Sequence, residues 1–173
     1  IKGRTGEGVI NDEDRTVIGN SIPRFTFGLN LGFEYKGFDF SCFFQGVGKA
    51  DGYVTMEAIQ PMGINGARKE HYKESFNPQD PKPGAYFPRI LSSDYNYAYM
   101  SHWVQDASYI RLKNLQIGYS FKIKGLNQLR VYASGENLFT ATKYRTWDPE
   151  TPVGARGFYP NVAVYSMGVN LNF

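Results

Sequence analysis

The segment that most constrains the fold is residues 163–173, AVYSMGVNLNF, in which apolar and polar side chains alternate. The odd positions are all apolar or aromatic and end on Phe173, whereas the even positions from Ser166 onward are polar or glycine. A period of two residues is typical of a β-strand with one apolar face. Such a face must lie against either a packed protein core or a lipid bilayer, and every position but Val164 fits a membrane strand.

The same alternation predicts a hairpin near the beginning of the chain. In residues 25–35, FTFGLNLGFEY, every odd position is apolar or aromatic. Lys36 and Gly37 then suit a tight turn, after which residues 37–47 place their apolar side chains at even positions, with Phe43 as the exception.

A second pair of strands is predicted over residues 108–122 and 128–139, joined by a short turn at Gly125. The alternation slips at Lys113–Asn114, which predicts a β-bulge. The sequence therefore predicts an all-β chain with five antiparallel strands, at 25–35, 37–47, 108–122, 128–139 and 163–173.

The connections between these strands alternate between short and long. The long ones are residues 1–24, 48–107 and 140–162. Residues 65–76 predict a helix within the middle one, with His71 facing solvent. Outer-membrane barrels pair short periplasmic turns with long external loops and gather aromatics at their rims. The short-turn end would collect such aromatics, namely Phe33, Tyr35, Phe38, Phe40, Tyr119 and Phe121.

Five strands are too few to close a barrel, and an open sheet in hydrocarbon would leave its edges unpaired. We therefore expect further strands from a longer chain or from other copies. The sequence shows no export signal from Ile1 onward, which also favours a piece of a longer protein or a removed signal.

Composition narrows the function classes. The net charge of +3 is mild and no run of Lys or Arg is present, so we expect no nucleic-acid partner. The one cysteine, Cys42, excludes an internal disulfide. The two histidines, His71 and His102, have no partner at metal-ligand spacing, and no nucleophile elbow is present. We therefore expect neither an enzyme nor a metal site.

Four stretches resemble the C-terminal end of SusC/RagA-type TonB-dependent outer-membrane transporters of Bacteroidetes. They are GEGVINDEDRTVIGNSIPRFTFGLNLGFEYKGFDFSCFFQG at 6–46, DASYIRLKNLQIGYSF at 106–121, LRVYASGENLFTATKYRTWDPE at 129–150 and the terminal SMGVNLNF. The resemblance implies that residues 1–173 are the last five strands of a 22-stranded transmembrane barrel in the outer membrane, with external loops at 1–24, 48–107 and 140–162. It implies active import of oligosaccharides or peptides, energised through TonB.

The resemblance also implies partners. These are a SusD-like surface lipoprotein, the TonB complex through a region outside these residues, outer-membrane lipid, and a dimer of transporter–lipoprotein pairs. Residues 3–14 have the shape of the family's calcium loop, but Gly3 and Thr5 replace the usual Asp and Asn. We therefore expect this degenerate loop to bind calcium poorly.

Two sets of side chains are candidates for contact with a substrate. Aromatic rings stack on sugars or apolar side chains and arginine binds carboxylates, which points to residues of the long loops, namely Arg89, Tyr95, Tyr97, Tyr99, Trp103, Arg145 and Trp147. The alternative is that these aromatics pack the loops together. The strand parity predicts a set facing the lumen, namely Asp39, Ser41, Gln45, Arg130, Tyr132 and Glu136. Phe173 is expected to act as an assembly signal.

A second function class also fits the alternation. A soluble β-sandwich, such as a carbohydrate-binding module, would likewise alternate apolar and polar side chains along its strands. The two classes differ in whether the apolar face is covered by protein, and the sequence pattern leaves both open.

Overall fold

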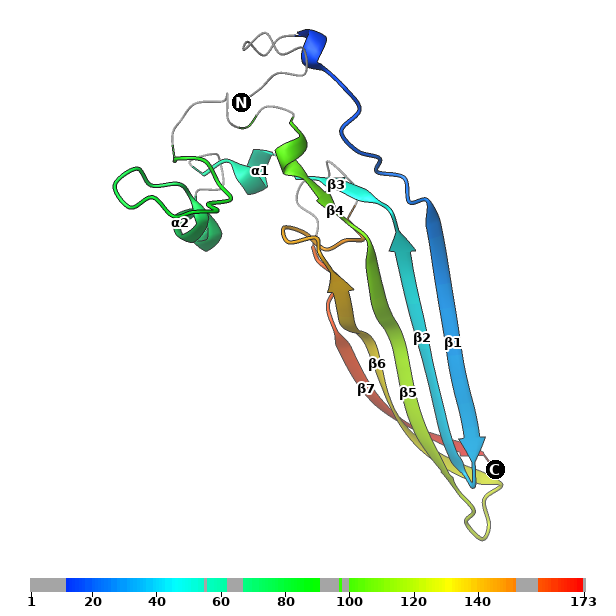
Figure 1. The fold of residues 1–173 in the computed structure, drawn as a ribbon. Coiled ribbons are helices and arrows are strands. Elements are labelled where there is room, and N and C mark those ends of the chain that lie inside the picture. Colours follow the sequence, from blue (N-terminus) through cyan, green and yellow to red (C-terminus); the bar gives the residue numbers. More distant parts are fainter. Residues whose placement is uncertain are drawn as a thin grey trace.

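The fold is a long, curved antiparallel sheet with a small lobe at one end (Figure 1). It was obtained as a computed structural model that describes residues 12–54, 56–61, 67–90, 97, 100–151 and 159–172. The five strands of the sheet lie side by side in the order in which they occur in the chain, and the lobe is inserted between the second and the third. All four strand pairs are antiparallel.

The prediction of five antiparallel strands is confirmed. Their bounds are Phe25–Tyr35 for β1, Phe38–Gly48 for β2, Tyr109–Phe121 for β5, Gln128–Thr142 for β6 and Val164–Asn172 for β7. β6 continues to Thr142, beyond the end at residue 139 that the sequence indicated, because Thr140, Ala141 and Thr142 still pair with β5. Phe173 lies outside the described residues.

The predicted turn and bulge are both present. Lys36 and Gly37 have φ values of 49° and 85°, as a type I′ hairpin turn requires. In the β2–β5 pair, Phe43 lies opposite Asn114 and Phe44 lies opposite Leu112, so Lys113 is the extra residue. The bulge restores the apolar parity of β5 after the slip in the sequence.

The strand register divides the sheet into an apolar face and a polar face. One row across all five strands is Tyr35, Phe38, Tyr119, Val131 and Val169; another is Phe33, Phe40, Ile117, Ala133 and Met167. The rows that alternate with these hold mainly polar residues and glycine, for example Gly32, Ser41, Gln116, Ser134 and Ser166, with Phe43 and Val164 as exceptions. No charged side chain falls on the apolar face of the described strands.

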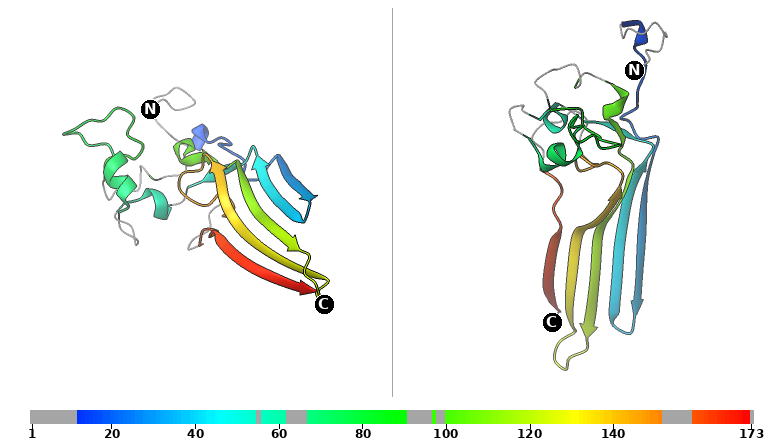
Figure 2. Two further views of the ribbon diagram at one scale, coloured as in Figure 1. Left: turned by 90° about the horizontal axis from the view of Figure 1, so that it is seen from below. Right: turned by 60° about the vertical axis from the view of Figure 1, so that its left-hand side comes forward.

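The apolar face is uncovered. Most of its large side chains are exposed, from 37% for Phe38 to 91% for Met167. A few in the middle strands are half-buried among their neighbours in the sheet, namely Phe40, Phe44, Leu112, Leu115 and Leu129. Two further views show a single curved layer, and no described element packs on its apolar face (Figure 2). A β-sandwich would cover this face with a second sheet, so the arrangement disfavours the soluble-module alternative. No helix within the described residues is long and apolar enough to cross a bilayer.

The lobe is built mainly from the segment between β2 and β5. It contains the short strands β3 (Asp51–Tyr53) and β4 (Val104–Asp106), the helices α1 (Met56–Ile59) and α2 (Lys69–Glu74), and the 3₁₀ turn η3 (Ser101–Trp103). Another 3₁₀ turn, η1, spans Asp12–Asp14 near the start of the chain. The core of the lobe consists of Val54, Ala58, Ile59, Phe87, Tyr97, Trp103, Ala107 and Tyr144. Because Tyr144 follows β6, this core joins both long connections.

The expectation that His71 faces solvent is wrong. The predicted helix is shorter than residues 65–76, and His71 is 0% exposed within it. Its Nε2 lies 2.8 Å from the carbonyl oxygen of Ala58, its Nδ1 accepts the amide hydrogen of Arg68 at 3.1 Å, and its ring meets Phe87 edge-on at 4.6 Å. Backbone groups satisfy both ring nitrogens, which offsets the cost of burial.

Trp103→Ala should unfold the lobe locally while leaving the sheet intact. Trp103 is 1% exposed, and truncating a buried tryptophan costs about 3–5 kcal/mol. Hydrogen exchange over residues 67–90 should accelerate strongly, with strands β5 and β6 unaffected. The matched control is Tyr72→Ala, at a side chain that is 85% exposed. Equal protection of the lobe in both variants would contradict the core assignment.

Candidate functional site

The polar face carries two clusters of charged and hydrogen-bonding side chains at different heights. All six residues predicted to face the lumen belong to this face. Asp39 and Tyr132 share the row through Gly118, Ser41 shares the row through Gln116, and Gln45 pairs with Arg111. Arg130 and Glu136 have the same parity along β6 as Tyr132. That this face lines a lumen stays a prediction.

The first cluster lies near the short-turn end and spans three strands. Arg130 on β6 reaches across β5 to Asp39 on β2, with Nε 2.9 Å from Oδ2 and Nη2 2.5 Å from Oδ1. The crossing is open because position 118 on β5 is glycine; a Cβ there would lie 2.7 Å from Nη2 of Arg130. The guanidinium also lies 4.9 Å from the centroid of the Tyr132 ring. This bidentate pair ties β2 to β6 across β5.

The second cluster, which we call the Arg111 hub, fixes the long β6–β7 connection to the sheet. Arg111 on β5 is 2% exposed. Its Nη2 donates to both carboxylate oxygens of Asp148, at 2.8 and 2.7 Å, and its Nη1 donates to Glu150 at 2.9 Å. Its Nε donates to the hydroxyl of Thr140 at 2.8 Å. Four acceptor contacts satisfy a buried guanidinium.

Glu150 is the second centre of the hub. Its carboxylate accepts hydrogen bonds from the Tyr109 hydroxyl at 2.9 Å and from Nζ of Lys113 at 2.8 Å, in addition to Arg111. The side-chain amide of Asn161 donates to it as well. Four donors therefore converge on this one carboxylate and fix its position. The hub thus holds the loop after β6 against the sheet.

A cavity of about 400 Å³, which we call the wall cavity, lies beside the hub on the polar face. Its walls come from the segment before β1, from β2, β3 and β5, and from the loop after β6. The polar groups that line it include Ser21, Gln45, Asp51, Tyr109, Lys113, Glu150 and Thr151. Gln45 is the one residue of the predicted lumen set that lines this cavity. Its mixture of donors and acceptors suits a small polar portion of a ligand.

The aromatic residues predicted to contact substrate lie in different surroundings. Tyr97 and Trp103 are buried in the lobe core, so they favour the alternative that these aromatics pack the loops. Burial raises the pKa of the Tyr97 phenol, as it does for Tyr144 in the same core, so both stay neutral. The helices in the described part of the lobe, Met56–Ile59 and Lys69–Glu74, are short, so large rings supply most of the apolar area that it buries.

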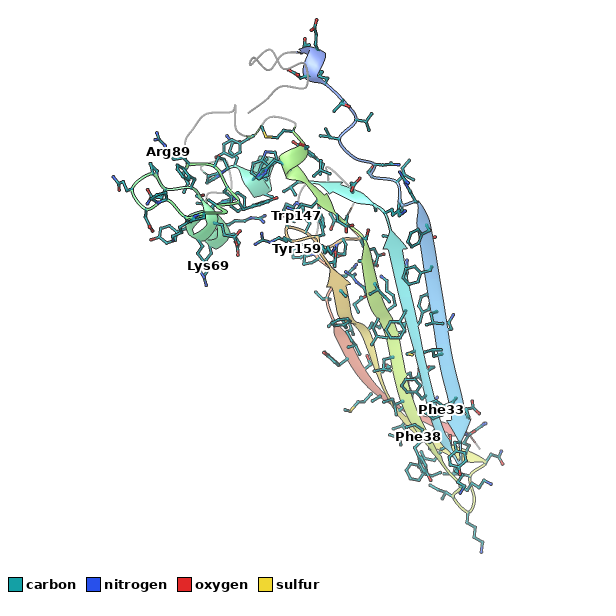
Figure 3. The ribbon with its side chains drawn as sticks, in the orientation of Figure 1. Phe33, Phe38, Lys69, Arg89, Trp147 and Tyr159 are labelled. Carbon is teal, nitrogen blue, oxygen red and sulfur yellow. The ribbon has the colours of Figure 1, made fainter. Side chains whose placement is uncertain are left out.

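The other predicted loop residues do not form one site. Trp147 is half-buried, and the guanidinium carbon of Arg68 lies 4.8 Å from the centroid of the Trp147 ring. Arg145 is exposed and pairs with Glu74 at 2.8 Å. Arg89 is exposed on the far side of the lobe from Trp147 (Figure 3). Tyr95 and Tyr99 lie outside the described residues.

Most of the predicted calcium loop also lies outside the described residues. Of residues 3–14, only Asp12, Glu13 and Asp14 are described, and they form the 3₁₀ turn η1. Asp12 pairs with Arg15 at 2.9 Å. In the described part of the chain, no cluster of three His, Cys, Asp or Glu residues is placed to hold a metal ion.

The Arg111 hub was not identified from the sequence. Two features of the sequence point to these residues. Arg111 has the parity of the polar face of β5, and Asp148-Pro149-Glu150 belongs to one of the stretches that carry the family resemblance. Their pairing spans 37 positions for Asp148 and 39 for Glu150, which no local pattern reveals.

Arg111→Met should release the loop after β6. Removing one partner of a buried ion pair costs about 3–5 kcal/mol because the remaining charges stay unpaired. Hydrogen exchange over residues 143–151 should accelerate. Arg145→Met is the matched control: its ion pair with Glu74 is largely exposed and should contribute at most about 1 kcal/mol. If the two variants behave alike, the hub does not hold the loop.

Comparison with known proteins places the chain in a family. No protein-family model matches it. Among curated proteins, TonB-dependent receptor P3 of Formosa agariphila is 35% identical over 97% of this chain and 18% of the receptor. TonB-dependent receptor SusC of Bacteroides thetaiotaomicron is 27% identical over 98% of this chain and 17% of SusC. The chain thus spans less than a fifth of these relatives.

Solved structures give the same fold. The RagAB peptide transporter matches with a TM-score of 0.77 and 23% identity, over 96% of this chain and 19% of that chain. The RagAB peptide importer in its open-open state matches with a TM-score of 0.74 and 24% identity, over 96% of this chain and 19% of that chain. The similarity to these proteins agrees with the apolar and polar faces of the sheet. The chain therefore belongs to the SusC/RagA-type TonB-dependent receptors and is a segment of their β-barrel.

Proposed function

We propose that this chain is a wall segment of an outer-membrane barrel that imports oligosaccharides or peptides and catalyses no reaction of its own. The observation that carries the proposal is the continuous apolar face across five strands, exposed and free of charge, with polar rows on the opposite face. A bilayer accepts such a face only if every backbone group is paired, which a closed barrel achieves. The unpaired edges of β1 and β7 would be completed by further strands.

In this proposal the short turns face the periplasm and the lobe lies outside the cell. The turn at Lys36–Gly37 and the connection after Phe121 lie at one end of the sheet, and the lobe lies at the other (Figure 1). Barrels of this class have that asymmetry. The described parts of the predicted external loops, 1–24, 48–107 and 140–162, lie at the lobe end. We propose that Phe173 acts at the periplasmic rim as the assembly signal.

The partners follow from the resemblance. We propose a SusD-like lipoprotein over the lobe end, energy from TonB through another part of the receptor, and a dimer of transporter–lipoprotein pairs. The substrate class is open between glycans and peptides, because the names of the curated relatives give no substrate and the solved neighbours are a peptide importer. The wall cavity and the hub would form part of the substrate path.

Uptake by the whole receptor tests the proposal. Cells that carry the receptor, the same cells without it, and cells without TonB would receive labelled oligosaccharides and labelled peptides in turn. Accumulation of one class that needs both the receptor and TonB is the expected result. Accumulation that persists without TonB, or the release of cleaved products by the purified receptor, would contradict it.

A lysine on the apolar face of β1 should impair assembly of the receptor in the outer membrane, whereas a lysine at the adjacent position on the polar face should not. Leu31→Lys puts an ammonium group on the apolar face at mid-strand, which costs about 2–4 kcal/mol at the bilayer midplane. Asn30→Lys places it on the polar face and is the matched control. The measurement is the amount of heat-modifiable receptor in outer-membrane fractions. Equal losses in both variants would contradict the assignment of the two faces.

A further inference from the structure

The short-turn end of the apolar face carries a dense group of aromatic rings. Phe33 stacks with Phe38 and Phe40 at centroid distances of 6.0 and 5.3 Å, and Tyr119 meets Phe121 at 4.7 Å. These rings lie in neighbouring rows of the sheet. Figure 3 places Phe33 and Phe38 at the end of the molecule opposite Lys69 and Arg89 of the lobe. Rings at this level of a membrane protein lie at the interface with the headgroups.

Three lysines lie immediately beyond these rings, in the two turns of the same end. They are Lys36, Lys122 and Lys124, and all three are exposed. The turns are joined, because the amide of Ser120 donates to the carbonyl oxygen of Gly37 at 2.7 Å. Nζ of Lys36 lies 5.1 Å from the centroid of the Tyr35 ring, which puts this ammonium group beside an apolar-face side chain.

These cations have no carboxylate within their own turns. Residues 35–38 read YKGF and residues 119–127 read YSFKIKGLN, so neither contains Asp or Glu. The nearest acidic residues along β1 and β2 are Glu34 and Asp39. They lie opposite each other in the strand register, and both belong to the polar face. Asp39 is already held there by Arg130.

The backbone at Lys36 supports a role for the ammonium group itself. Lys36 has a φ of 49°, a conformation that costs strain in any residue with a Cβ and that Asn, Asp or Gly adopt more readily in this turn type. A lysine at this position is therefore a poor choice for turn formation alone.

We propose that this rim binds anionic phospholipid, with the ammonium groups of Lys36, Lys122 and Lys124 contacting headgroup phosphates and the rings contacting the upper acyl chains. Positive side chains close to a membrane surface attract anionic lipid, and long lysine stems extend from an apolar surface toward the headgroups. The exposed side chain of Ile123, between two of the lysines, would enter the same interface. The proposal rests on the membrane location proposed above and adds the headgroup class.

Native mass spectrometry of the whole receptor in mild detergent tests this rim. Equal amounts of phosphatidylglycerol and phosphatidylethanolamine would be titrated in, and the retained adducts counted. We expect the anionic lipid to be retained preferentially. In the triple variant K36Q/K122Q/K124Q, the ratio of retained phosphatidylglycerol to retained phosphatidylethanolamine should fall by about fivefold or more. About fivefold is the change expected from the loss of one positive charge near the membrane surface. The matched control K69Q/K73Q/K82Q removes three exposed lysines of the lobe and should keep the preference.

Several outcomes would overturn the proposal. They are equal retention of the two lipids by the unmodified receptor, an equal loss of preference in the control variant, or removal of the preference by inorganic phosphate alone. Heat-modifiable mobility of each variant verifies that the barrel is folded. Uptake and the Leu31→Lys comparison are measured separately, so a failure of this proposal is distinguishable from a failure of the proposed membrane function.

Discussion

Backbone hydrogen bonding that runs through five consecutive antiparallel strands is the interaction on which the other features of this chain depend. It fixes the register, and the register decides that Tyr35, Phe38, Tyr119, Val131 and Val169 share one face. A shift of one residue in any strand would move its apolar set to the polar face. The bulge at Lys113 is the local exception that keeps both halves of β5 in phase, and it brings the Lys113 ammonium group to Glu150.

The polar face uses its charges to connect distant parts of the chain. Asp39 and Arg130 join strands β2 and β6 across a glycine, and Arg111 joins β5 to the loop after β6. The lobe depends on a different interaction, the burial of large rings and of His71, whose nitrogens are satisfied by backbone groups. Two sets of contacts, the Arg111 hub and the lobe core, thus hold the long connections at one end of the sheet.

Sequence patterns predicted the sheet well because its signal is local. Alternation in residues 25–35 and the turn at Lys36–Gly37 need only neighbours a few positions apart, and even the bulge at Lys113 leaves a visible slip. The site was harder. Trp103 resembled a binding residue by type but is buried, His71 resembled a solvent-facing residue by its charged neighbours, and the partners of Arg111 are distant in the chain. Burial and long-range pairing are properties of the fold that composition does not encode.

The central claim is that the apolar face of this sheet contacts lipid. The most direct measurement is spin-label accessibility along β1, with single cysteines at each position from 25 to 35 of the whole receptor in bilayers and native Cys42 replaced by serine. Oxygen, which concentrates in lipid, should reach the odd positions, and a water-soluble nickel complex should be excluded from them, in strict alternation with the even positions. Loss of the alternation, or odd positions that favour the nickel complex, would contradict the account.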